Sequence, residues 1–155
     1  MDEKQIVETW EIHNRINLYL LDATEAAALI SLSSSKGRTV GEQFGHLHNV
    51  RLMWLKAAAP ELLAGLAKIE KEHAKDKKLL RRSLENSSKA IVALLTQSLK
   101  DGGRVKGFKP HAVAFLGYLI SHESHHRGQI ILSLKQAGTI LDKKILYGIW
   151  EWGVR

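Results

Sequence analysis

Hydrophobic residues recur at three- and four-residue steps along most of the chain, which is the pattern of helices with one buried face. In the first such segment the recurring positions are Ile6, Trp10, His13, Ile16 (or Asn17) and Leu20. The pattern predicts a helix over about residues 3–32, followed by a serine-rich loop at residues 33–37.

Two further helices follow. Thr39 and Glu42 form a Thr-x-x-Glu capping box, which satisfies free backbone amides at a helix start. A second helix is therefore predicted from this box to about residue 59, where Pro60 ends it. A third, charged helix is predicted over about residues 76–100. Its expected core stripe consists of Leu80, Leu84, Ile91 and Leu95.

The last long helix is predicted over about residues 110–137, with Gly138 as a left-handed cap after it. The tail, residues 141–152, is expected to pack back onto the bundle through Leu146, Ile149, Trp150 and Trp152. Four long helices joined by loops predict an all-α fold, a four-helix bundle with a short C-terminal helix packed on it. The length of 155 residues suits a single domain, residues 1–155.

The composition limits both the class of protein and the residue types that could bind a metal. Apolar residues make up 45% of the chain and charged residues 25%, as in an ordinary globular protein. No apolar run reaches the roughly 18–20 residues that cross a bilayer, and the charged N-terminus lacks a signal peptide's apolar stretch. We therefore expect a cytoplasmic protein without a membrane partner. Cysteine is absent, so any metal must be held by histidine, carboxylate and water.

The formal charge of +7 raises the question of nucleic-acid binding. Much of the excess lies in residues 68–82, where Glu70, Glu72 and Asp76 interrupt the basic residues and no aromatic residue is present for base stacking. A solvated surface explains this run, and we expect no nucleic-acid partner.

Histidine is the most informative residue type. His122 and His126 are four residues apart, so on a helix they lie on one face, one turn apart. They continue an apolar stripe that contains Leu119 and Ile130, whereas His125 flanks that stripe. A single buried histidine would be interpreted as a hydrogen-bonded core residue. Two successive stripe positions favour metal ligation instead, and imidazole suits zinc, nickel, copper and iron.

Two histidines do not complete a site, because catalytic metals commonly use three protein ligands and a water. The predicted second helix supplies the other close histidine pair, His46 and His48. Each shares a helix face with apolar residues, so periodicity alone leaves the choice between them open.

Three segments resemble the DinB/YfiT-like family of metalloenzymes. The run His122-x-x-x-His126-Arg-Gly-Gln resembles that family's fourth-helix signature, and residues 44–54 resemble its second-helix motif. Residues 148–152 resemble the closing segment of some members. The resemblance implies a four-helix bundle, often a homodimer, with zinc or nickel bound by His46, His122 and His126. The spacing from His46 to the aromatic Trp54 favours His46, and His48 is the alternative.

The resemblance also implies an activity, because some relatives transfer or isomerise substrates with a low-molecular-weight thiol such as bacillithiol or mycothiol. A thiol bound beside a divalent ion and three neutral imidazoles would be the reactive thiolate. The chain has no cysteine, so the thiol would be a cosubstrate. Glu123 is a candidate general base or a helix-surface charge. Arg51 and Arg127 are candidates for holding a carboxylate of the thiol, and Arg127 alternatively for pairing with a protein carboxylate.

Three functions follow as hypotheses. The first is a metal-dependent enzyme, a thiol S-transferase or a related hydrolase or isomerase. The second is a non-catalytic metal- or ligand-binding stress protein. The third is a structural metal that staples the bundle, which would need a fourth protein ligand such as His48 or His125.

Overall fold

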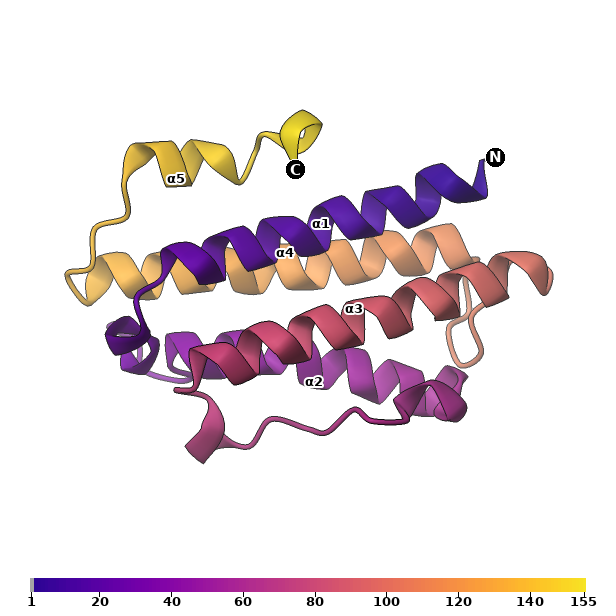
Figure 1. Cartoon of the computed structure of the whole chain (residues 1–155), viewed down its shortest axis with the longest axis horizontal. Coiled ribbons are helices and arrows are strands. Elements are labelled where there is room, and N and C mark those ends of the chain that lie inside the picture. The colour runs from indigo at the N-terminus through magenta and orange to yellow at the C-terminus, as the bar shows by residue number, and fades with distance from the viewer. Residues whose placement is uncertain (1) are drawn as a thin grey trace.

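The computed structural model describes residues 2–155 and consists mainly of four long helices (Figure 1). These helices are α1 (Glu3–Ala23), α2 (Val40–Ala58), α3 (Lys77–Lys100) and α4 (Ala112–Gln136). Helices α1 and α2 each pack against both α3 and α4. The predicted all-α four-helix bundle is confirmed.

The order of the helices in space brings the two histidine-rich segments together. Helices α1 and α4 run in one direction, and α2 and α3 run in the other (Figure 1). The α2–α3 connection, residues 59–76, therefore runs back along the bundle and contains two short 3-10 helices, Pro60–Leu63 and Lys71–His73. As a result α2 packs antiparallel to α4.

Local sequence signals account for several helix ends. The capping box of α2 is present: the Glu42 amide donates to Thr39 Oγ1 at 3.1 Å, and the Thr39 amide donates to Glu42 Oε2 at 2.7 Å. Asp76 caps α3 by accepting a hydrogen bond from the Leu79 amide at 3.0 Å. Gly138, with φ of +86°, follows α4 in the left-handed conformation as predicted.

One predicted boundary is wrong. The first helix ends at Ala23, not near residue 32, because Thr24 turns extended and its Oγ1 donates to the Leu20 carbonyl at 2.8 Å. The chain then forms a separate 3-10 helix, Ala26–Ile30, that buries Leu29. Helix α4 begins at Ala112 because His111 caps it, its Nδ1 accepting from the Ala114 amide at 3.2 Å.

The core consists of two apolar clusters with a polar layer between them along every helix. One cluster contains Phe44, Leu80 and Ile130, and the other contains Trp10 and Phe115. The predicted α3 stripe is buried in these clusters. The buried polar residues of the layer are His13, Asn14, Asn17, His48, Arg51, Ser87, Ser88, Glu123, His126 and Arg127. Polar side chains in the middle of a bundle need partners, and the site below supplies them.

The tail forms α5 (Lys143–Gly148) and the 3-10 helix Trp152–Val154. It packs on α1 around Tyr19: a Cβ on Gly148 would lie 2.3 Å from the Tyr19 hydroxyl, and the Arg155 guanidinium lies 3.8 Å above the Tyr19 ring. Ile149 is buried, but Trp150 is 76% exposed, so the predicted packing holds for only part of the tail.

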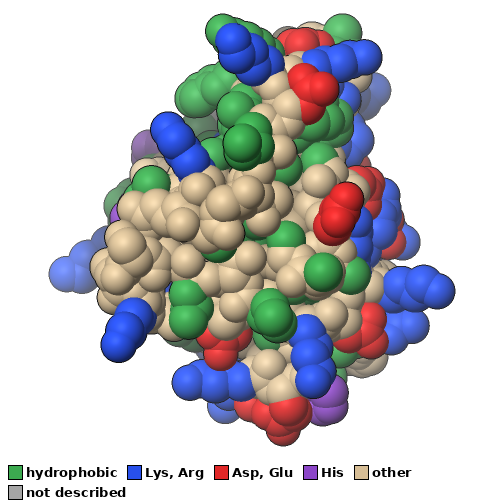
Figure 2. Space-filling view, turned by 90° about the vertical axis from the view of Figure 1, so that its left-hand side faces the viewer, with side chains coloured by type: hydrophobic (Ala, Val, Ile, Leu, Met, Phe, Trp, Pro, Cys, Tyr) green, Lys and Arg blue, Asp and Glu red, His purple; other side chains and the backbone are tan. Residues whose placement is uncertain are grey.

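The surface carries both signs of charge. Figure 2 shows lysine and arginine side chains spread around one end of the bundle, with acidic side chains between them. Lys68 faces Glu70 at 3.6 Å within the basic run. No helix within residues 2–155 is both long and apolar enough to cross a membrane.

Candidate metal centre

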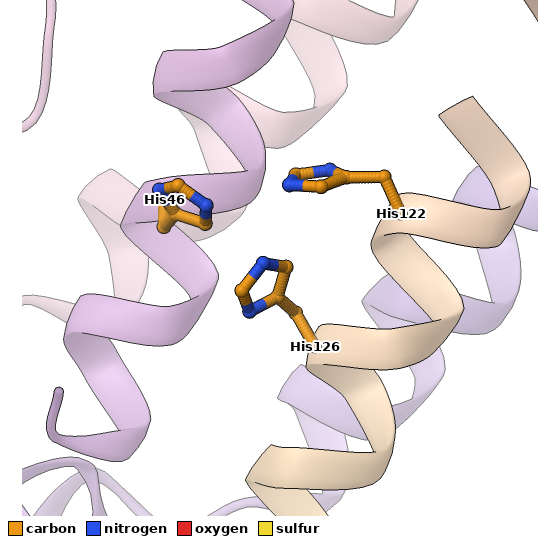
Figure 3. Close-up of side chains that lie close together, drawn as sticks. All are labelled: His46, His122 and His126. Carbon is orange, nitrogen blue, oxygen red and sulfur yellow. The ribbon is translucent and has the colours of Figure 1, made fainter. Parts of the chain in front are cut away.

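Three histidines meet between α2 and α4. His46 extends from α2 toward His122 and His126 on α4 (Figure 3). The His46 ring centroid lies 4.4 Å from that of His126 and 5.3 Å from that of His122, and the two α4 rings are 4.6 Å apart. One ring nitrogen from each residue lies within 4.8 Å of the others. Within residues 2–155, no other group of three or more possible metal ligands lies this close together.

The donor set fits a divalent ion. Imidazole nitrogens are common ligands of zinc and nickel, and three of them with an open fourth position are typical of a catalytic zinc site. His122 Nδ1 is buried and has no hydrogen-bond partner among the described residues. His13 Nδ1 and Trp54 Nε1, which lie outside the cluster, share this property, so it does not by itself mark a metal ligand.

The orientation of His126 is fixed by two glutamines. Its Nδ1 lies 2.7 Å from Gln43 Oε1 and 3.1 Å from Gln129 Oε1. Both oxygens are acceptors, so Nδ1 carries the proton and Nε2 keeps its lone pair free. Metal-ligating histidines are usually held in this way by a hydrogen bond to the second nitrogen. Gln129 belongs to the run of α4 that carries the family resemblance. Gln43, one turn before His46, was missed by the sequence analysis.

All three rings are neutral near pH 7. Burial, with Arg38 and His122 adding to it, lowers the pKa of His46 to about 4. Burial, with His46 adding to it, lowers the pKa of His126 to about 4, and burial also lowers the pKa of His122. Neutral imidazole is the form that binds metal, so the cluster needs no deprotonation at neutral pH.

The two alternative histidines lie elsewhere. His48 is buried on another face of α2, with Nδ1 3.0 Å from the Ser83 carbonyl oxygen and Nε2 2.8 Å from that of Ala67. His125 is exposed and contacts Gln129. Neither joins the three-histidine group, so the structure brings His46, and not His48, to the α4 pair.

The two candidate catalytic residues contact each other in the core. Arg51 donates from Nε to Glu123 Oε1 at 2.7 Å and from Nη2 to Oε2 at 2.8 Å. Glu123 Oε2 also lies 2.9 Å from His13 Nε2 and accepts from Asn17 at 2.8 Å. Glu123 is 1% exposed, so it is not a surface charge. Burial alone would raise the pKa of Glu123, but Arg51 and His13 hold it below its usual range.

Arg127 is also turned into the bundle. Its Nη1 donates to Asn17 Oδ1 at 2.7 Å, and its Nη2 donates to Ser124 Oγ at 3.1 Å. It therefore pairs with an amide and a hydroxyl instead of a carboxylate. His13 and Asn17 also belong to this network; both were placed on the inward face of the first helix, but their pairing with Glu123 and Arg127 was not predicted.

A cavity of about 440 Å³ opens beside His46, between α2 and the α2–α3 connection. That connection packs closely against α2, since a Cβ on Gly41 would lie 1.8 Å from the Ala74 carbonyl oxygen. The cavity wall includes Arg38, Asn49 and Ile69 as well as His46. Its volume is in the range of small-molecule sites, which are about 300–1,000 Å³. A small ligand can thus approach the cluster from the His46 side.

The fold and the site define a class: a four-helix bundle with three histidines converging between its second and fourth long helices. The family model described as the DinB family matches residues 1–143, so the chain belongs to the DinB family. The match spans all four long helices, and the resemblance seen in the sequence is confirmed at this level. Neither the curated proteins nor the solved structures gave a match to this chain.

Proposed function

We propose that this protein binds one divalent metal ion, zinc or nickel, through His46, His122 and His126. The convergence of three neutral imidazoles from two helices, with ligand nitrogens within 4.8 Å, carries the proposal. The glutamine contacts to His126 Nδ1 support it, because they fix the ring with its other nitrogen available.

An ion accessible to ligands fits better than a purely structural one. A structural zinc site is usually closed by four protein ligands. The group within residues 2–155 offers three, and His48 and His125 lie outside it. The cavity beside His46 would let a small ligand reach the cluster from that side.

We further propose that the site serves a reaction that uses a low-molecular-weight thiol as cosubstrate. A divalent ion held by neutral imidazoles would lower the pKa of a thiol beside it. The chain contains no cysteine, so the thiol must enter from outside, through the cavity next to His46. In this proposal Arg51 and Glu123 are positioning residues, because they join α2 to α4 in the core and do not line the cavity.

A second candidate is a metal- or ligand-binding protein without catalysis. The specific observation in its favour is the placement of Glu123, the acid next to His122 in the chain. Its carboxylate is engaged by Arg51, His13 and Asn17 and is 1% exposed, so it is not available as a base.

The test begins with metal analysis of protein purified without added metal, for which we expect about one zinc or nickel ion per chain. Holo-protein, chelated protein and His126→Ala protein are then assayed for conjugation of a model electrophile, each with and without added thiols. Turnover that needs both metal and thiol supports the transferase. Equal rates in all samples leave the binding protein, and activity without thiol indicates a hydrolase.

A further inference from the structure

Arg38 lies at the cavity beside the histidine cluster without a partner. It lines the same cavity as His46, and it also lines a second cavity with Gln43 and Gln129, which hold His126. Its guanidinium makes no hydrogen bond or ion pair with any of residues 2–155, although eight other arginine and lysine side chains bond to or pair with neighbouring oxygens. The guanidinium is thus free to bind an anion.

The backbone holds Arg38 in place. Lys36 and Gly37 both have positive φ, +64° and +92°, and turn the chain into α2. Thr39, the next residue, is fixed by both hydrogen bonds of the capping box. Arg38 therefore extends from an anchored helix start, and its side chain reaches the cavity from a defined point.

The other charged residues of the cavity are Glu42, Glu70 and Glu72 and two lysines, Lys68 and Lys71, so the charge of Arg38 balances the cavity as a whole. Glu42 is bound to the Thr39 amide in the capping box, and Lys68 faces Glu70. Lys71 and Glu72, of opposite sign, are neighbours in the chain.

We propose that Arg38 is a specificity-determining residue that binds the carboxylate of a small anionic ligand whose other end lies at the His46, His122 and His126 cluster. The inference rests on the proposed metal and thiol function. A guanidinium binds a carboxylate through two parallel hydrogen bonds, which a lysine does not reproduce. Arg51 and Arg127, the arginines expected in this role from the sequence, are committed to the core network, whereas Arg38 faces the cavity.

The test uses cobalt(II)-loaded full-length protein and two probe thiols of matched shape, 3-mercaptopropionate and its neutral amide, 3-mercaptopropionamide. Apparent dissociation constants come from the sulfur-to-cobalt absorption band. The acid can also chelate the ion by itself, so the decisive quantity is the change in the acid-to-amide preference between wild type and Arg38→Gln. Because the guanidinium–carboxylate pair is exposed, we expect Arg38→Gln to lower the acid-to-amide preference by about fivefold. Binding of the amide should be unchanged.

Two variants complete the design. Arg38→Lys should retain part of the preference, because it keeps the charge but not the two-pronged geometry. Lys71→Gln, which removes another cation from the same cavity, should change the preference by less than about twofold. An unchanged preference in Arg38→Gln, or an equal loss in Lys71→Gln, would overturn the role of Arg38 while leaving the metal site intact. Failure of the wild type to bind cobalt, seen in the metal content before any thiol is added, would overturn the metal centre and this proposal with it.

Discussion

Arg51 donates hydrogen bonds to both carboxylate oxygens of Glu123, at 2.7 and 2.8 Å, and so links α2 to α4 inside the bundle. Glu123 directly follows His122, and Arg51 lies five residues after His46. The pair therefore fixes how the two helices that carry the histidines lie against each other. Buried ion pairs contribute little net stability, but losing one partner leaves the other charge uncompensated.

The first prediction concerns this pair. Glu123→Gln keeps the shape of the side chain but leaves the buried Arg51 without its counter-charge. We expect the free energy of unfolding to fall by about 3–5 kcal/mol, measured by urea titration. The control is Glu85→Gln, which removes a half-exposed partner of Arg81 and should cost less than about 1 kcal/mol. Wild-type stability in Glu123→Gln, combined with lost turnover, would make Glu123 a catalytic base instead.

The second prediction separates ligands from bystanders. His46→Ala, His122→Ala and His126→Ala should each nearly abolish metal binding, because a three-ligand site cannot lose a ligand without a large loss of affinity. His125→Ala should keep close to one ion per chain, and so should His48→Gln, which keeps a polar side chain opposite the Ser83 and Ala67 carbonyl groups. Metal content is measured after dialysis. Full metal in any variant of the first group would refute the triad.

The third prediction concerns the support of His126. Gln43→Leu removes the acceptor 2.7 Å from His126 Nδ1, and only the longer Gln129 contact then orients the ring. Loss of such an outer contact typically weakens metal binding by about 10–100-fold, and we expect the lower end here because Gln129 remains. A competition titration with a chelator measures the affinity. Gln97→Leu, on the exposed surface of α3, is the matched control and should leave the affinity unchanged.

Local rules explain what the sequence could predict. Helical periodicity, the Thr39–Glu42 capping box and the His122–His126 spacing each depend on residues within one or two turns. The end of α1 does not, because no glycine or proline marks it. Thr24 ends the helix by turning extended, and the apolar residues that follow it, such as Leu29, pack into the core from a separate turn instead of continuing the helix.

The third metal ligand and the polar layer could not be identified from the sequence alone. His46 and His48 both lie on partly apolar faces of α2. Only tertiary packing separates them, because α4 packs against the face of His46, whereas α3 and the α2–α3 connection pack against the face of His48. His13 meets Glu123 across 110 residues of sequence, a pairing that no local pattern contains. Polar residues on the inward stripe of α1 were the available signal for that network. No sequence pattern pointed to a role for Arg38.

The fourth prediction concerns self-association. We expect a homodimer, as the family resemblance implies, with the tail as the contact surface. Trp10 is fully buried, whereas Trp150 is 76% exposed beside Tyr147 at 70%. Aromatic residues are enriched at protein interfaces. Light scattering at micromolar concentration should give twice the chain mass, and Trp150→Glu should give a monomer. The matched control is Met53→Glu, another exposed apolar residue far from the tail in sequence, which should stay dimeric. A monomeric wild type would contradict this expectation.

The fifth prediction concerns the stability of metal-free protein at acidic pH. Burial lowers the pKa of five histidines from the ordinary value of 6.5, namely His13, His46, His48, His122 and His126. Below pH 6.5 the unfolded chain therefore binds protons that the folded chain does not, and the free energy of unfolding must fall with pH. The fall continues to about pH 4, where His46 and His126 become protonated in the folded protein. Glu123 acts in the same direction, because its pKa is lowered and its stabilising charge is lost at lower pH still.

The measurement is the urea midpoint of chelated protein between pH 7.5 and pH 4.5, and we expect a continuous decrease below about pH 6.5. His48→Gln removes one of the buried titrating groups outside the cluster, so its midpoint should depend less steeply on pH than that of the wild type. Gln97→Leu, at the exposed surface of α3, changes no titratable group and should leave the slope unchanged. A midpoint that stays level from pH 7.5 to pH 5 would contradict neutral, buried histidines, and with them the readiness of the cluster to bind metal at neutral pH.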